Sequence, residues 1–221
     1  MKIFFRCLLI SEDFHATTTG DMFNGALETT STTLEWLMNY LAENPEVQDK
    51  LRAEIEKEVG TSRYPGLLDR PRMPYALAVV EELLRIRPAL AIGIFHRTLE
   101  DVDFHGFRLP KNTMVMSNLW GVQHDDRVWD TPDKFIPGRF IGEDGKLVKN
   151  ENVIAFSAGR RICPGEGLAR DQLFLYTTRI CQKFRIRFPP GKGPAEEIFG
   201  LSLQPEPFQV QFFEINTENT I

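Results

Sequence analysis

Residues 156–165 read Phe-Ser-Ala-Gly-Arg-Arg-Ile-Cys-Pro-Gly and place Cys163 in a glycine-rich loop, directly before a long apolar stretch with helical spacing. Backbone N–H groups of such a loop can point at the sulfur, and the positive end of the following helix stabilises a thiolate. The glycines let the backbone approach a flat ligand. A thiolate held in this way is a good axial ligand for haem iron, which is the chemistry that this loop predicts.

Other cysteine chemistries fit this sequence less well. A phosphatase loop would need an arginine six residues after the cysteine, and position 169 is alanine. A phosphate-binding loop would need Gly-Lys-Ser/Thr, and a zinc site would need clustered Cys and His, and the sequence contains neither pattern. The other two cysteines, Cys7 and Cys181, are interpreted as small buried apolar side chains.

A second group of reactive side chains lies in the run Gly-Ala-Leu-Glu-Thr-Thr at residues 25–30. The small residues Gly25 and Ala26 remove bulk from one helix face, and Glu28 and Thr29 offer a carboxylate and a hydroxyl beside that gap. A threonine within a helix can divert a backbone hydrogen bond and bend the helix, and such bends often accompany functional sites. The alternative interpretation is a solvated threonine run on an ordinary helix.

A third group joins two distant segments. Glu82 and Arg85 are three residues apart on one predicted helix face, where an exposed pair would contribute only about 0.2–0.5 kcal/mol. Arg139 lies in the later run Pro-Asp-Lys-Phe-Ile-Pro-Gly-Arg-Phe at residues 132–140.

These segments together resemble the cytochromes P-450, the haem-thiolate monooxygenases, and in particular their microsomal animal type. In chain order, the family patterns are small-Gly-x-acid-Thr-Thr, Glu-x-x-Arg, Pro-x-x-Phe-x-Pro-x-Arg-Phe and Phe-x-x-Gly-x-Arg-x-Cys-x-Gly. The chain has all four in this order. One departure is Ala26, which stands where the family usually has glycine. The resemblance covers the chain from about residue 21 and corresponds to the C-terminal half of a complete member, so we expect a truncated or partial product.

The resemblance implies haem b (iron protoporphyrin IX) as the cofactor, with Cys163 as the iron ligand. It places Phe156, Gly159 and Gly165 around that ligand. It implies that Arg161 and His96, with Arg97 as a second candidate, bind the haem propionates. Thr29 and Glu28 would organise water and deliver protons on the oxygen side of the haem. Glu82, Arg85 and Arg139 would form a buried cluster that braces the cysteine loop.

The implied reaction inserts one oxygen atom of dioxygen into an apolar small molecule, while the other oxygen leaves as water. Electrons would come from NADPH through a flavoprotein reductase that docks on the cysteine side, where Arg160, Arg161 and Arg170 offer positive charge. Residues 90–95 would form a wall facing the substrate. Localisation at the cytoplasmic face of the endoplasmic reticulum membrane also follows from the resemblance. A haem-binding fragment without turnover, and a fragment without a stable fold, stay open as alternatives.

Composition agrees with a globular domain. The 42% hydrophobic content and 17 Phe residues are ample for a core, and the net charge of −5 argues against a nucleic-acid partner. Three cysteines without a pairing pattern favour a reducing compartment. The apolar run at the start is broken by Arg6, is too short to span a bilayer and is followed by no signal-peptide cleavage region, so any membrane contact would come through a preceding part.

The predicted fold is mainly α with a small β component, the C-terminal half of the cytochrome P-450 fold. Residues 1–20 are predicted to be a poorly ordered lead-in, and residues 21–221 a partial monooxygenase domain. Periodicity predicts helices over 21–42, from Pro45 to a stop at Gly60, over 75–87 and over 168–184. A β-hairpin is expected over 102–117, strands over 185–188 and 208–213, and a loop over 189–199.

Overall fold

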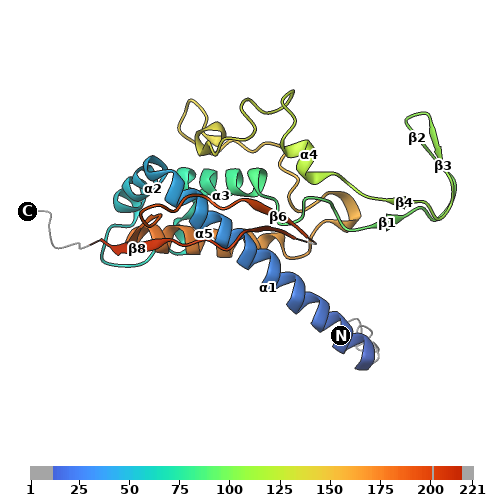
Figure 1. Cartoon of the computed structure of the whole chain (residues 1–221), viewed down its shortest axis with the longest axis horizontal. Coiled ribbons are helices and arrows are strands. Elements are labelled where there is room, and N and C mark those ends of the chain that lie inside the picture. Colours follow the sequence, from blue (N-terminus) through green and yellow to red (C-terminus); the bar gives the residue numbers. More distant parts are fainter. Residues whose placement is uncertain (1–11, 201, 216–221) are drawn as a thin grey trace, which may run out of the picture.

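The computed structural model describes residues 12–200 and 202–215. The α-helices are α1 (Glu12–Glu43), α2 (Pro45–Glu58), α3 (Pro74–Ile86), α4 (Leu119–Gln123) and α5 (Glu166–Lys183). Three 3₁₀ segments join them: η1 (Leu67–Arg72), η2 (Pro137–Phe140) and η3 (Gly159–Arg161). The strands are short and form two-stranded antiparallel ladders. The prediction of a mainly helical fold with a small β component is confirmed (Figure 1).

The core lies where α2, α3 and α5 pack against the C-terminal part of α1 (Figure 1). Its fully buried side chains include Trp36, Leu41, Leu51, Leu83 and Phe174. Burial of such side chains contributes about 1.5–3 kcal/mol each relative to an exposed position. The helices that carry the predicted site residues are therefore fixed to one another by a shared apolar core.

Helix α1 begins earlier than the sequence predicts. Residues 12–20, predicted as part of an irregular lead-in, are helical, so that expectation is wrong for these residues. The physical reason is that no proline interrupts residues 12–43, and adding a residue to an existing helix costs little once the nucleus has formed. The first part of α1 extends away from the core, with exposed Met22, Phe23 and Leu27 (Figure 1). A domain boundary at residue 20 stays a prediction.

The other main helices end close to their predicted bounds because proline, glycine and acidic residues mark them. Helix α3 starts at Pro74 and ends before Pro88, whose ring disfavours helical geometry in the residue that precedes it. The Glu54 carboxylate of α2 accepts hydrogen bonds from the backbone N–H groups of Tyr75 and Ala76, each at 2.8 Å. This contact satisfies free donors at the start of α3 and fixes its position on α2.

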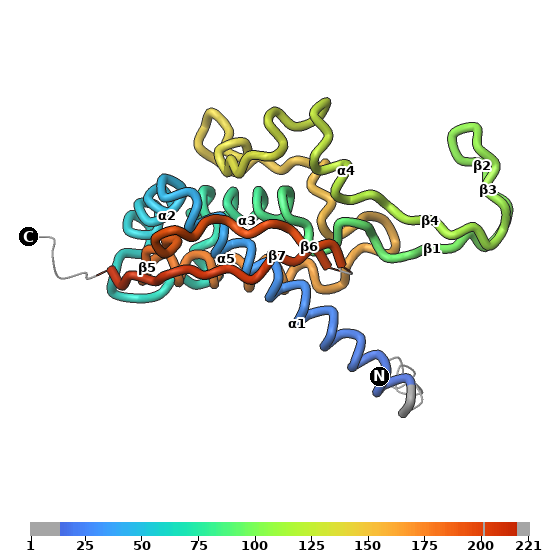
Figure 2. Tube along the Cα trace, in the orientation of Figure 1, coloured from blue at the N-terminus to red at the C-terminus, as the bar shows by residue number. Residues whose placement is uncertain are grey.

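The predicted hairpin over 102–117 divides into two ladders. Strand β2 (Val102–Phe104) pairs with β3 (Phe107–Leu109), whereas β4 (Met114–Val115) turns back to pair with β1 (His96–Arg97). The reversal occurs at Asn112, whose φ of 69° is left-handed, and the carboxylate of Asp101 accepts a hydrogen bond from Lys111 N at 2.9 Å. The β2–β3 hairpin consequently lies at the far end of the β1–β4 ribbon (Figure 2).

The C-terminal segment forms two further ladders. Strand β5 (Phe184–Arg187) pairs with β8 (Gln211–Glu214), close to the predicted positions of both strands. Strand β6 (Glu197–Phe199) lies inside the stretch predicted as a loop and pairs with β7 (Leu203–Pro205). Strand β7 also contacts α1, which brings the end of the chain against its first helix.

Candidate haem-binding site

The Cys163 loop is shaped by two left-handed residues, Ser157 (φ 65°) and Gly159 (φ 74°). The loop curls back so that Cys163 N donates a hydrogen bond to Phe156 O at 3.0 Å. This fold places Cys163 three residues before Glu166, the first residue of α5. Cys163 is a free, partly exposed cysteine at the N-terminal end of that helix.

Glycines leave the surroundings of the sulfur open. A Cβ atom at position 165 would lie 3.8 Å from Cys163 Sγ, which is ordinary contact distance, and a Cβ at Gly159 would meet nothing within 4 Å. The requirement for glycine at position 159 is therefore its positive φ rather than lack of space.

Phe156 anchors the loop to the core. It packs against the cluster of Val80, Leu84 and Leu173, which α3 and α5 provide. The guanidinium of Arg170 lies over the Phe156 ring, 5.2 Å from its centroid.

Arg170 also forms two ion pairs, to Glu166 Oε1 at 2.8 Å and to Glu81 Oε1 at 2.5 Å. The charge of Arg170 is thus paired within the protein, which gives it a structural role, and the docking role expected for it stays a prediction. Sequence reasoning missed this role, although the four-residue spacing from Glu166 to Arg170 was a signal for it. Arg160 and Arg161 remain exposed.

Glu82, Arg85 and Arg139 lie together as the sequence predicts. Arg85 Nε lies 2.7 Å from Glu82 Oε2, and Arg139 Nε lies 3.1 Å from Glu82 Oε1. The side chains of Glu82 and Arg85 are fully buried. Ile136 N also donates to Glu82 Oε1 at 2.8 Å, and both guanidinium groups lie near the ring of Trp129. The cluster joins α3 to η2; its bracing of the cysteine loop stays a prediction.

Thr29 and Glu28 lie on the part of α1 that leaves the core. The Thr29 hydroxyl donates to Gly25 O at 2.6 Å, and the helix continues through this region without a break. A Cβ atom at Gly25 would meet nothing within 4 Å, because Gly25 lies on the exposed part of α1. The Glu28 carboxylate accepts a hydrogen bond from Ser202 Oγ at 2.7 Å, a partner that sequence reasoning missed.

The predicted propionate partners carry exposed side chains. His96 and Arg97 lie on β1, and Arg161 lies in η3. Within the described part of the chain, the side chains of His96, Arg97 and Arg161 form no hydrogen bond or ion pair. They are therefore available to an anionic ligand.

The residues present fit a haem. Among residues 12–200 and 202–215, no group of three or more His, Cys, Asp or Glu side chains is arranged to hold a metal ion. A single protein sulfur suits an iron that a porphyrin already holds. Ile162 and Leu168 beside the sulfur, and Phe95 in the predicted substrate wall, are large apolar side chains exposed by 47%, 61% and 63%.

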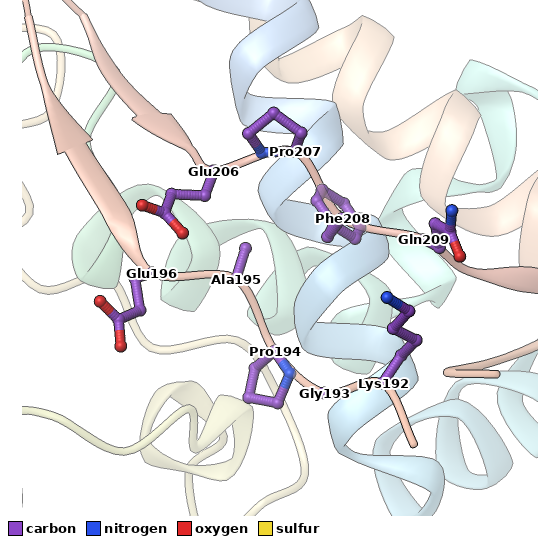
Figure 3. Close-up of a pocket in the computed structure, with 9 residues that line it drawn as sticks. All are labelled: Lys192, Gly193, Pro194, Ala195, Glu196, Glu206, Pro207, Phe208 and Gln209. Carbon is purple, nitrogen blue, oxygen red and sulfur yellow. The ribbon is translucent and has the colours of Figure 1, made fainter. Parts of the chain in front are cut away.

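One pocket of about 320 Å³ adjoins the predicted substrate wall. Its lining residues are Ala91, Ile92, Met116, Asn118, Trp120 and Phe199. A second pocket, of about 340 Å³, lies between residues 192–196 and 206–209 (Figure 3). Its charged lining residues are Lys192, Glu196 and Glu206. It includes none of the predicted site residues, and its charged lining does not suit a porphyrin face.

The prediction for Cys181 is confirmed, because the side chain is fully buried and burial raises the pKa of its thiol to about 12. The predictions for Cys7 and for the apolar run of residues 1–10 lie outside the described residues. Within the described part, no helix has the length and apolar character needed to cross a bilayer.

Comparison with known proteins decides the family, because the cytochrome P450 family model matches residues 9–212. This chain belongs to the cytochrome P450 family. It is 41% identical over 206 residues to a steroid 17-alpha-hydroxylase/17,20 lyase of Squalus acanthias, a match that covers 91% of this chain and 40% of that protein. It is 40% identical over 201 residues to cytochrome P450 2U1 of Mus musculus, covering 90% of this chain and 38% of that protein.

A solved structure supports the same assignment. A zebra fish cytochrome P450 structure with abiraterone has a TM-score of 0.87 and 37% identity to this chain, and the match covers 94% of this chain and 49% of that one. The predicted resemblance to a cytochrome P-450 of the microsomal animal type, and the prediction of part of that fold, are confirmed. The chain spans about 40% of the length of the curated relatives named above.

Proposed function

We propose that this chain is the cysteine-bearing part of a haem-dependent monooxygenase. The reaction inserts one atom of dioxygen into an apolar organic substrate and releases the other as water. The observation that carries the proposal is Cys163, a partly exposed thiol at the N-terminus of α5 in a loop that matches the family motif at every fixed position. The relatives' names, which include a steroid hydroxylase, support an apolar substrate.

The cofactor proposed is haem b, which supplies the iron that activates dioxygen when it is bound. Cys163, at the N-terminal end of α5, would provide the sulfur ligand to the iron. Arg161, His96 and Arg97 are available to hold the two propionates, since a guanidinium forms paired hydrogen bonds with a carboxylate. Phe156, Gly159 and Gly165 keep the sulfur accessible by shaping the loop.

On the substrate side, Glu28 and Thr29 of α1 hold and move protons. Residues 90–95 would form an apolar wall facing the substrate, and Ala91 and Ile92 of this stretch line the pocket of about 320 Å³. Family members that isomerise or dehydrate oxygenated lipids tend to lack the acid-threonine pair, so its presence favours monooxygenation.

The partners proposed are an NADPH-dependent flavoprotein reductase and the cytoplasmic face of the endoplasmic reticulum membrane. Arg160 and Arg161 are exposed beside the cysteine loop and offer positive charge for the reductase.

A second candidate is a haem-binding fragment that does not turn over. The chain matches about 40% of each of these two relatives, and residues 90–95 leave Ile94 and Phe95 exposed by 60% and 63%. A pocket with uncovered walls excludes water poorly, which favours cofactor binding without productive oxygen transfer.

The test is a carbon monoxide difference spectrum of the reduced, haem-reconstituted chain. We expect a thiolate-type spectrum, which Cys163→Ser abolishes because an alcohol is a far weaker iron ligand than a thiolate. Cys181→Ala, which removes the buried sulfur, should keep the spectral type. Equal spectra from the chain and from Cys163→Ser would contradict the proposal, and a thiolate spectrum without product formation would favour the second candidate.

A further inference from the structure

The turn between β6 and β7 meets α1 at Glu28. Ser202 Oγ donates a hydrogen bond to Glu28 Oε1 at 2.7 Å, and Gln204 Nε2 lies 3.4 Å from the same oxygen and 3.1 Å from Ser202 Oγ. Ser202 is only 3% exposed, whereas Glu28 is an exposed residue. A buried hydroxyl and an amide thus converge on one carboxylate from 174 and 176 residues further along the chain.

The hydroxyl of Ser202 is held in place by its backbone. Leu203 N donates to Ala89 O at 2.8 Å, and Trp36 Nε1 donates to Leu203 O at 2.8 Å. Gly200 N donates to Ser202 O at 3.2 Å. The segment is therefore fixed to α1 on one side and to the residues that follow α3 on the other.

Glu28 has no comparable support from its own helix. It lies on the part of α1 beyond the core, one residue before Thr29, whose hydroxyl is already bonded to Gly25 O. A glutamate side chain that is free in solvent samples many rotamers, and fixing it costs entropy that the hydrogen bonds must offset. A hydrogen bond from a buried, fixed hydroxyl to a charged carboxylate offsets this cost and favours one rotamer.

We propose that Ser202 is a positioning residue, which holds the Glu28 carboxylate in one rotamer where α1 meets the turn between β6 and β7, with Gln204 as a second donor. The inference rests on the proposed function for the role of Glu28 in proton movement. It adds that the C-terminal segment, and not α1 alone, fixes the geometry of the acid. Phe199, which pairs with Leu203 next to Ser202 at the turn end of the same ladder, lines the apolar pocket, so one short segment carries both pocket lining and acid position.

The contact is tested by infrared difference spectroscopy on the full chain. Subtracting the spectrum of Glu28→Gln isolates the carboxylate stretching bands of Glu28. We expect Ser202→Ala to shift these bands toward those of a water-exposed carboxylate, and Ser202→Thr to restore them because threonine keeps the hydroxyl. Ser202→Cys, which keeps the side-chain shape but donates weakly, should behave like Ser202→Ala. Ser62→Ala removes a hydroxyl from an exposed turn and is the matched control.

The consequence for the reaction is measured on the haem-reconstituted chain with reductase and NADPH. We expect Ser202→Ala to increase peroxide release relative to product by about tenfold, the factor that loss of one charged hydrogen bond corresponds to, and Ser202→Thr to reverse the increase. Unchanged bands in Ser202→Ala, or failure of Ser202→Thr to restore them, would overturn the inference. Shifted bands with an unchanged peroxide ratio would overturn its link to proton movement. A chain that takes up no haem overturns the proposed function instead, and the infrared comparison still decides whether Ser202 holds Glu28.

Discussion

At the scale of single residues, backbone conformation matters as much as side-chain chemistry in the cysteine loop. Gly159 and Ser157 both have positive φ, and serine pays a steric cost there that glycine does not. The loop therefore stores some strain next to Cys163. Its sulfur is presented by this backbone path together with the packing of Phe156 under Arg170.

Two glycines on either side of Cys163 in the sequence, Gly159 and Gly167, should respond to alanine in opposite ways. Gly159→Ala forces a side chain into the left-handed region and should lower the free energy of unfolding by about 1–2 kcal/mol. Gly167→Ala lies in α5, where a Cβ meets nothing within 4 Å, and should raise it by up to about 1 kcal/mol. Denaturant unfolding of both variants measures the difference, and equal changes would contradict the assigned backbone geometry.

The identity of these residues was predictable from sequence, and their partners mostly were not. Motif spacing identified Cys163, Glu82, Arg85 and Arg139, because each belongs to a local pattern with fixed offsets. The pairing of Arg170 with Glu81, 89 residues away, and of Ser202 with Glu28 depends on how distant segments meet. No periodicity within one segment carries that information.

At the scale of elements, α3 is the element on which the candidate site depends. It carries Glu82 and Arg85 on one face, toward η2, and Val80 and Leu84 toward Phe156 of the cysteine loop. Its start is fixed by Glu54 of α2. A change on one face of α3 can therefore reach the loop through a single rigid helix.

Glu82→Gln should destabilise this arrangement strongly. It leaves the guanidinium groups of Arg85 and Arg139 without their carboxylate in a buried site, which typically costs about 3–5 kcal/mol. We expect that loss in denaturant unfolding and, with it, failure to incorporate haem. Glu35→Gln removes an exposed carboxylate from α1 and should stay within about 0.5 kcal/mol. Normal haem loading of Glu82→Gln would contradict the bracing role of the cluster.

The predicted ends of helices and strands were accurate where the local sequence signals were strong. Helices α3 and α5 were predicted within two residues because Pro74, Pro88 and Gly165 mark their ends. The start of α1 was missed because threonine-rich residues 12–20 have weak intrinsic preference and no capping pattern that distinguishes loop from helix. The β1–β4 pairing was missed because the turn at Asn112 reads like a simple hairpin turn.

At the scale of the whole molecule, the packed core and the first part of α1 differ in burial. The core around Trp36 and Leu83 is closed, whereas Met22, Phe23 and Leu27 on α1 are each at least 60% exposed. Apolar surface of this extent favours association with other apolar groups. The chain matches about 40% of each curated relative named above, and these side chains have no cover among the residues that the structure describes.

Removing apolar side chains from the exposed part of α1 should reduce association without loss of stability. We expect the double variant Phe23→Gln, Leu27→Gln to bind less of a hydrophobic dye and to sediment as a smaller species. Leu41→Ala, at a fully buried position, should instead lower the free energy of unfolding by about 2–5 kcal/mol without reducing dye binding. Unchanged dye binding in the double variant would show that this face is not the associating surface.

The contact between Trp36 and Leu203 spans 167 positions and has a consequence for biosynthesis. A nascent polypeptide leaves the ribosome from its N-terminus, so Trp36 of α1 can form this contact only after the 167 residues that follow it have been translated. Closing so long a loop is entropically slow, and intermediate species expose unpaired apolar surface meanwhile. The nascent chain should therefore depend on chaperones until the β6–β7 ladder has formed.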